Sequence, residues 1–147
     1  MFKGSFKYSV DAKGRMSLPA KIREQVNKEA NNKFVMTRGA ARCIEIFPFD
    51  YWQMYIEPRL TALDQFDTEV PKFLRRYLQF MDDDTLDSQS RLLIPHNLIE
   101  YAGIEKEVLI LGQVMKIEVW NPKEFDDYMA KQTEPYEEIA RKVMTQS

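Results

Sequence analysis

The stretch Asp11-Ala-Lys-Gly-Arg15-Met-Ser-Leu-Pro19, near the start of the chain, returns later as Asp87-Ser-Gln-Ser-Arg91-Leu-Leu-Ile-Pro95. Each copy has an aspartate, an arginine four residues on, a short apolar run and a proline. Proline suits the first turn of a helix, because its missing N–H would have no partner there. The segments 34–37 and 43–48 likewise correspond to 108–111 and 116–122. This repeat predicts that one supersecondary unit occurs twice in the chain.

Each copy is expected to form a small β-rich unit. Phe6, Tyr8 and Val10 alternate with polar residues, which is the period of a half-buried strand. A turn at Lys13-Gly14 and a short strand at 16–18 complete a hairpin whose tip carries Lys13 and Arg15. A helix should run from Pro19 to Asn31-Asn32, followed by strands near 33–37 and 43–47. Because such a unit buries little apolar surface alone, we expect it to pair with the second unit or with another chain.

The second unit repeats this plan, and helices are expected around it. Its predicted elements are strands near 85–86, 92–94, 108–111 and 115–120 and a helix from Pro95 to about Ala102. Apolar residues at helical spacing predict a connector helix over 49–63, which Pro58 should kink or split, and another from Pro71. A terminal helix should start at Pro122, with a second short one after Pro135. Asp82-Asp83-Asp84 is interpreted as a solvated cap or loop and not as a magnesium site.

These elements predict an α+β, β-rich fold, built as a pseudo-twofold repeat with connecting and C-terminal helices. The expected divisions are unit 1 at 1–50, the helical connector at 51–80, unit 2 at 81–124 and the C-terminal helix at 125–147. The chain is 12% aromatic. We therefore expect some aromatic side chains of the connector and C-terminal helices to contact other subunits, although a core role is equally open for each.

Charge is distributed unevenly along the chain. The net charge is −2, yet residues 1–47 hold ten Lys and Arg against four Asp and Glu. A basic segment in an acidic chain indicates a surface for a polyanion, because Lys and Arg contacts to phosphates supply much of the affinity for DNA. An uneven but simply solvated surface is the alternative.

Catalytic and metal-binding patterns are not apparent in the sequence. There is no Gly-rich phosphate loop and no Ser/His/Asp set, and Cys43 and His96 are the only residues of their kind. We therefore expect no enzyme activity, no metal and no cofactor. One catalytic alternative is a pair of carboxylates, Asp11 and Asp87, that share a proton. The arginine beside each aspartate argues against it, because a nearby cation lowers a carboxyl pKa and keeps the group ionised.

Four segments together resemble the MraZ family of bacterial transcriptional regulators. They are Met1-Phe-Lys-Gly4, the two repeated stretches and Ile117-Glu-Val-Trp120. The resemblance implies two tandem SpoVT/AbrB-type units and a ring of identical subunits. It also implies a regulator, acting as a repressor, that binds short direct repeats upstream of the division and cell-wall gene cluster, including its own gene. The expected location is the cytoplasm, in association with the nucleoid, since no apolar run is long enough for a signal peptide or a membrane span.

The resemblance also indicates which residues bind DNA. Lys13, Gly14 and Arg15 match the family's DNA-facing loop, and Asp11 is expected to hold that loop. On charge and strand placement alone, Lys3, Lys7 and Arg38 are expected to contact phosphates.

The second copy departs from the first at the tip of its hairpin. It has Gln89 and Ser90 in place of Lys13 and Gly14. We therefore predict a structural role for Asp87 and Arg91. The alternative for the whole chain is an antitoxin-like or assembly module whose acidic C-terminal part binds a protein partner.

Overall fold

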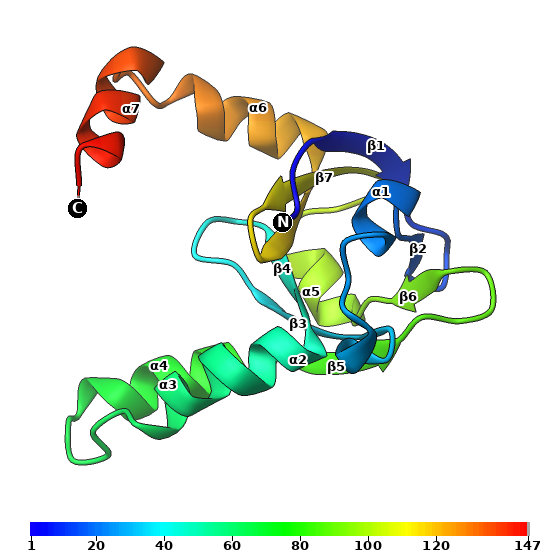
Figure 1. The fold of residues 1–147 in the computed structure, drawn as a ribbon, viewed down its shortest axis with the longest axis horizontal. Helices are drawn as coiled ribbons and strands as arrows, with labels where there is room; N and C mark the ends of the chain where they lie inside the picture. The colour runs from blue at the N-terminus through cyan, green and yellow to red at the C-terminus, as the bar shows by residue number, and fades with distance from the viewer. Residues whose placement is uncertain (147) are drawn as a thin grey trace.

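The computed structural model describes residues 1–146 of the chain. A six-stranded antiparallel sheet has the order β1-β7-β8-β4-β3-β5, and a separate two-stranded ribbon joins β2 to β6 (Figure 1). The strands are β1 (Ser5–Ser9), β2 (Arg15–Ser17), β3 (Lys33–Arg38), β4 (Ile44–Pro48), β5 (Asp82–Thr85), β6 (Arg91–Leu93), β7 (Glu107–Gln113) and β8 (Lys116–Trp120). With helices around this sheet, the predicted α+β fold is confirmed.

The strands of the two repeats are interleaved. Within the large sheet, β1 pairs with β7, β4 with β8 and β3 with β5, so each of these pairings joins the two halves of the chain. The ribbon does the same, because β2 belongs to the first repeat and β6 to the second. The expected pairing of the two units is thus confirmed. Where one unit ends and the next begins along the chain stays a prediction.

One hydrophobic core serves both halves. Met16 and Leu92, at equivalent positions of the repeat, are both fully buried in it. The helices α1 (Ala20–Arg23) and α5 (His96–Tyr101), which follow the two prolines, add Ile22 and Leu98 to the same core. Burying one such side chain stabilises a fold by about 1.5–3 kcal/mol. Neither half can therefore keep its apolar face dry without the other.

Two helical segments stand away from the sheet on either side of a gap (Figure 1). The connector consists of α2 (Phe49–Tyr51), the π-helical η2 (Trp52–Ile56), α3 (Glu57–Thr61) and the returning α4 (Glu69–Leu78). The C-terminal helices are α6 (Pro122–Ala130) and α7 (Tyr136–Met144). A short 3-10 helix, η1, covers Lys28–Ala30. Within residues 1–146, no helix combines the length and the apolar character needed to cross a bilayer.

Pro58 interrupts the regular connector helix. At the expected break the structure has a π-helical turn, Trp52–Ile56, which is followed directly by α3, with Pro58 in its first turn. Proline has no N–H to donate and its ring crowds the preceding turn. A π-helical turn is a common place for such a mismatch to be absorbed without ending the helix.

Two local predictions were wrong. Asp82-Asp83-Asp84 lies in strand β5 rather than in a cap or loop, because β5 pairs with β3 and Lys33 Nζ lies 3.8 Å from Asp83 Oδ1. Asp84 Oδ2 also accepts a 2.8 Å hydrogen bond from the Leu93 N–H, which ties β5 to β6. The helix after Pro19 is shorter than expected, because α1 ends at Arg23.

Candidate nucleic-acid-binding surface

Asp11 organises the turn that joins β1 to β2. Its Oδ1 accepts 2.9 Å hydrogen bonds from the backbone N–H groups of Lys13 and Arg15, and its Oδ2 accepts one of 2.8 Å from Arg15 Nε. The Gly14 N–H donates to the Asp11 carbonyl at 3.0 Å. Aspartate commonly stabilises turns through such bonds to the backbone two or more residues on. Of the three nitrogens of the Arg15 guanidinium, only Nε donates a hydrogen bond within residues 1–146. The two terminal nitrogens are therefore available for a ligand.

The turn between β5 and β6 has the same geometry. Asp87 Oδ1 accepts from the backbone N–H groups of Gln89, at 2.8 Å, and Arg91, at 3.0 Å, while Oδ2 accepts from Arg91 Nε at 3.0 Å. Ser90 takes the place of Gly14 with a φ of 60° where the glycine has 88°. The two turns therefore differ in their side chains and charge, not in their backbone plan.

The β2–β6 ribbon brings both arginines to one face. Its antiparallel register sets Ser17 opposite Arg91, and Arg15 opposite Leu93. Because side chains alternate along a strand, the fully buried Met16 and Leu92 point inward, and the four neighbours just named point outward. Arg15 and Arg91 are 34% and 25% exposed. Since the strands run in opposite directions, the two turns lie at opposite ends of this face.

Both aspartates are held ionised by their own turns. The Arg15 backbone N–H, together with its guanidinium and the Lys13 N–H, lowers the pKa of Asp11. Burial acts to raise the pKa of Asp87, but the backbone N–H groups of Arg91 and Gln89 and the Arg91 guanidinium outweigh it, so the pKa is lowered. A shared proton would need the two carboxyl groups close together. Instead, Asp11 and Asp87 belong to turns at opposite ends of the ribbon, and each accepts hydrogen bonds within its own turn.

Gly14 is buried beneath the turn. A Cβ at this position would lie 2.9 Å from the Ile94 carbonyl oxygen, and the Ile94 N–H donates to the Gly14 carbonyl at 2.9 Å. The backbone also has a positive φ, which residues with a side chain rarely adopt. Gly14 thus shapes the loop from within, where it joins the end of β6.

Replacing Gly14 by alanine is expected to lower the free energy of unfolding by about 1–3 kcal/mol, because the new Cβ meets both a strained φ and the fixed Ile94 carbonyl. Urea unfolding at matched protein concentration measures the change. Ser90→Gly is the matched control, since it relaxes the equivalent residue and should leave stability unchanged or slightly raised. A Gly14→Ala protein as stable as the wild type would show that the turn tolerates a side chain.

Known proteins match the chain along nearly its whole length. A family profile described as "MraZ protein, putative antitoxin-like" covers residues 1–77 and 82–146. The chain belongs to the MraZ family. Proteins named "Transcriptional regulator MraZ" are similar to it: that of Syntrophomonas wolfei subsp. wolfei is 38% identical over 98% of this chain and 97% of its own. The protein of the same name from Halothermothrix orenii is 39% identical over 95% of this chain and 94% of its own. That of Acetivibrio thermocellus is 36% identical over 97% of this chain and 96% of its own.

Two of the predicted phosphate contacts of this MraZ-family chain, Lys3 and Lys7, are exposed and lie just before and within strand β1. Lys7 lies on the edge strand β1 and lines a hollow of about 660 Å³ together with Ser17 of the ribbon and Lys106. Lys3 lines a smaller hollow beside Lys21 of α1. Lys106 and Lys21 were not among the predicted contacts. Lys21 belongs to the basic segment 1–47. Lys106 lies in the remainder of the chain, whose net charge is negative, so a count of charges by segment does not point to it.

Arg38 lies apart from the turn in this member of the MraZ family. It is at the end of β3, and β4, β8 and β7 separate that strand from β1. Its Nη1 donates to the Arg76 carbonyl at 2.9 Å, and its guanidinium carbon lies 4.9 and 4.5 Å from the ring centres of Phe80 and Tyr101. A phosphate contact by Arg38 stays a prediction, and these contacts within the chain give it no support.

Proposed function

We propose that the protein is a sequence-specific DNA-binding transcriptional regulator and that the Asp11–Arg15 turn contacts the DNA. The observation that carries the proposal is the geometry of Arg15, which is partly exposed on the outward face of the ribbon and whose Nε is held by Asp11. Among the side-chain hydrogen bonds of residues 1–146, none engages its terminal nitrogens. The name shared by its relatives, transcriptional regulator, supports the same function.

The turn suits base or phosphate recognition for a simple physical reason. A guanidinium can donate two parallel hydrogen bonds to guanine O6 and N7 or to a phosphate. Because Asp11 already fixes its orientation, Arg15 loses little further conformational freedom on binding. Lys13 at the exposed tip, with Lys3 and Lys7, would add phosphate contacts that set affinity rather than sequence preference.

Arg91 is assigned a structural role in this proposal. Its bonds to Asp87 repeat those of Arg15, but Gln89 and Ser90 give its turn no further positive charge. We infer that the second turn mainly maintains the ribbon and the fold.

The proposed targets are short direct repeats upstream of the division and cell-wall gene cluster, including the protein's own gene, where it acts as a repressor. The family resemblance supports these targets. The protein would act in the cytoplasm on the nucleoid, as a homo-oligomer in which identical subunits form a ring. Several turns in one assembly could then engage successive repeats of one operator, which raises affinity through effective concentration.

A second candidate is an antitoxin-like or assembly module that binds a protein partner. The family description "putative antitoxin-like" favours it, and so does the acidic C-terminal part of the chain. Its binding would not require DNA phosphates, so the dependence of binding on salt separates the two functions.

The test is equilibrium binding of the purified protein to DNA from upstream of its own gene, with unrelated DNA of the same length as control. The proposal expects clear preference for the upstream DNA. Equal affinity for both would contradict sequence-specific regulation and would favour the protein-partner function.

A further inference from the structure

Leu93 is an exposed apolar side chain on the outward face of the β2–β6 ribbon. It is 51% exposed and lies outside the hydrophobic clusters of residues 1–146. The antiparallel register of the ribbon sets it directly opposite Arg15. A Cβ placed on Gly14 would lie 3.9 Å from Leu93 Cδ1, so the leucine side chain borders the turn that carries Arg15.

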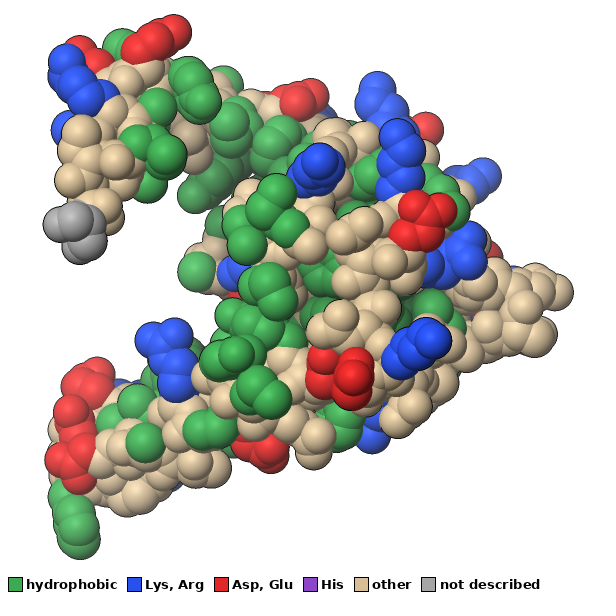
Figure 2. Space-filling view, viewed as in Figure 1, with side chains coloured by type: hydrophobic (Ala, Val, Ile, Leu, Met, Phe, Trp, Pro, Cys, Tyr) green, Lys and Arg blue, Asp and Glu red, His purple; other side chains and the backbone are tan. Residues whose placement is uncertain are grey.

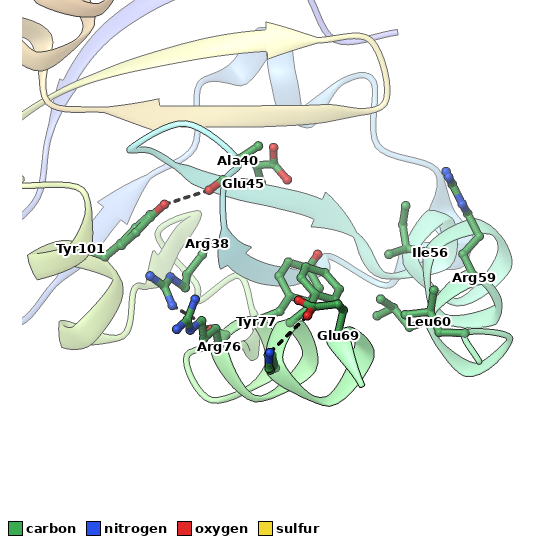
Figure 3. Close-up of a pocket in the computed structure, with 14 residues that line it drawn as sticks. Arg38, Ala40, Glu45, Ile56, Arg59, Leu60, Glu69, Arg76, Tyr77 and Tyr101 are labelled. Carbon is green, nitrogen blue, oxygen red and sulfur yellow. Dashed lines mark hydrogen bonds and ion pairs between the residues drawn. The ribbon is translucent and has the colours of Figure 1, made fainter. Parts of the chain in front are cut away.

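Other apolar side chains at the surface gather away from this ribbon. Figure 2 shows hydrophobic side chains along both helical projections. Ile56 and Tyr77 line a groove of about 790 Å³ between the α3–α4 hairpin and the β3–β4 connection (Figure 3). Leu93 belongs to neither surface. Its outward neighbours on the ribbon are all polar, namely Arg15, Ser17 and Arg91. An apolar contact on the ribbon face therefore has to come from Leu93.

The two ends of the ribbon face differ in this residue. Ser17 holds the position in the first repeat that Leu93 holds in the second, and Ser17 lies opposite Arg91. Arg15 thus has an apolar neighbour across the strands, whereas Arg91 has a hydroxyl group. The apolar neighbour is found at the end of the ribbon where Lys13 adds positive charge, which is the end proposed to contact DNA.

We propose that Leu93 contacts the C5-methyl group of a thymine beside the base pair that Arg15 recognises. This inference rests on the proposed function and names a second residue that determines the sequence preference. The major groove of B-DNA admits a two-stranded β-ribbon, and thymine presents its methyl group in that groove. The contact is favourable because leucine and methyl group both leave water.

The spacing of the two side chains suits two base pairs at once. Residues directly opposite each other on paired strands have Cβ atoms about 4.5–5.5 Å apart. Successive base pairs are about 3.4 Å apart along the helix axis. When Arg15 contacts one base pair, Leu93 therefore lies within reach of the next one, and the ribbon need not change its shape.

Replacing thymine by uracil in the upstream DNA tests the contact, because the two bases differ only in the C5-methyl group. Two duplexes of one sequence, with thymine or with uracil, are titrated with the wild-type protein and with Leu93→Ala by fluorescence anisotropy. The wild type should bind the thymine duplex about fourfold more tightly for each subunit in contact, which is the gain from burying one methyl-sized group. Leu93→Ala should bind the two duplexes equally.

Leu78→Ala is the matched control. Leu78 is also an exposed leucine, at 42%, but it lies at the end of α4 in the connector. This variant should keep the wild-type preference for thymine. Leu93→Ala should fold normally, because its side chain is half exposed and outside the core, and circular dichroism checks this.

The outcomes separate this contact from the proposed function. Equal binding of the wild type to both duplexes would overturn the contact and leave sequence-specific binding intact. A preference for thymine that survives in Leu93→Ala would overturn it too, because another residue would then cover the methyl group. A wild-type protein with no preference for upstream over unrelated DNA would contradict the proposed function itself.

Discussion

Replacing Arg15 by alanine is expected to weaken binding to the upstream DNA by roughly 5- to 150-fold for each turn in contact, because a good bidentate contact to a base is worth about 1–3 kcal/mol. In an assembly that engages several repeats the losses multiply, so specific binding should disappear at ordinary protein concentrations. Fluorescence anisotropy with labelled DNA measures the change. The fold should persist, since Arg15 is partly exposed and outside the hydrophobic core.

Arg91→Ala is the matched control for this variant. It removes the same ion pair, with the same geometry, from the opposite end of the ribbon. We expect it to retain upstream binding to within a few-fold while losing some stability. If Arg91→Ala abolished DNA binding in a folded and assembled protein, the division of roles between the two turns would be wrong.

The number of repeats in the DNA is expected to have the second large effect. Reducing an operator from three repeats to one should lower affinity by about 10²-fold or more. With three repeats, binding by one subunit raises the effective concentration of the neighbouring subunits at the other two, and a single repeat removes this gain. Repeats spaced near one helical turn present the same groove face to neighbouring subunits. Titration of a series of duplexes with one, two and three repeats measures this dependence.

A shuffled duplex of matched length and composition controls for non-specific binding in that series. Inserting half a helical turn between repeats should weaken binding nearly as much as deleting a repeat, because one site then faces away. A single repeat bound as tightly as three would contradict the multivalent account.

Much of the fold follows from the repeat, but the pairing of its strands does not. Alternation at Phe6, Tyr8 and Val10 predicts a strand, yet period two carries no information about which edge it joins. That β1 pairs with β7 of the other repeat goes with the burial of Val108 and Ile110 of β7 in the shared core, which is a long-range effect. The strand at Asp82-Asp83-Asp84 was missed for the same reason: aspartate disfavours strands locally, and long-range contacts with β3, Lys33 and Leu93 hold these residues in one.

The candidate site divides in a similar way. The Asp11–Arg15 turn could be predicted because all its partners lie within five residues of one another. Ser90 at positive φ could not, because nothing in the sequence marks a serine that replaces a glycine in this conformation. Lys106 and Arg38 show the limit of charge counting. The sheet order brings the first beside Lys7 and separates the second from it.

Binding of the wild-type protein to its upstream DNA across a series of salt concentrations tests the central claim most directly. If a basic turn contacts phosphates in several subunits, log affinity should fall linearly with log salt, with a slope of about −0.9 for each phosphate neutralised. Preference for the upstream sequence over unrelated DNA should persist across the series. Absence of sequence-specific binding at low salt would contradict the account and leave the protein-partner function as the better one.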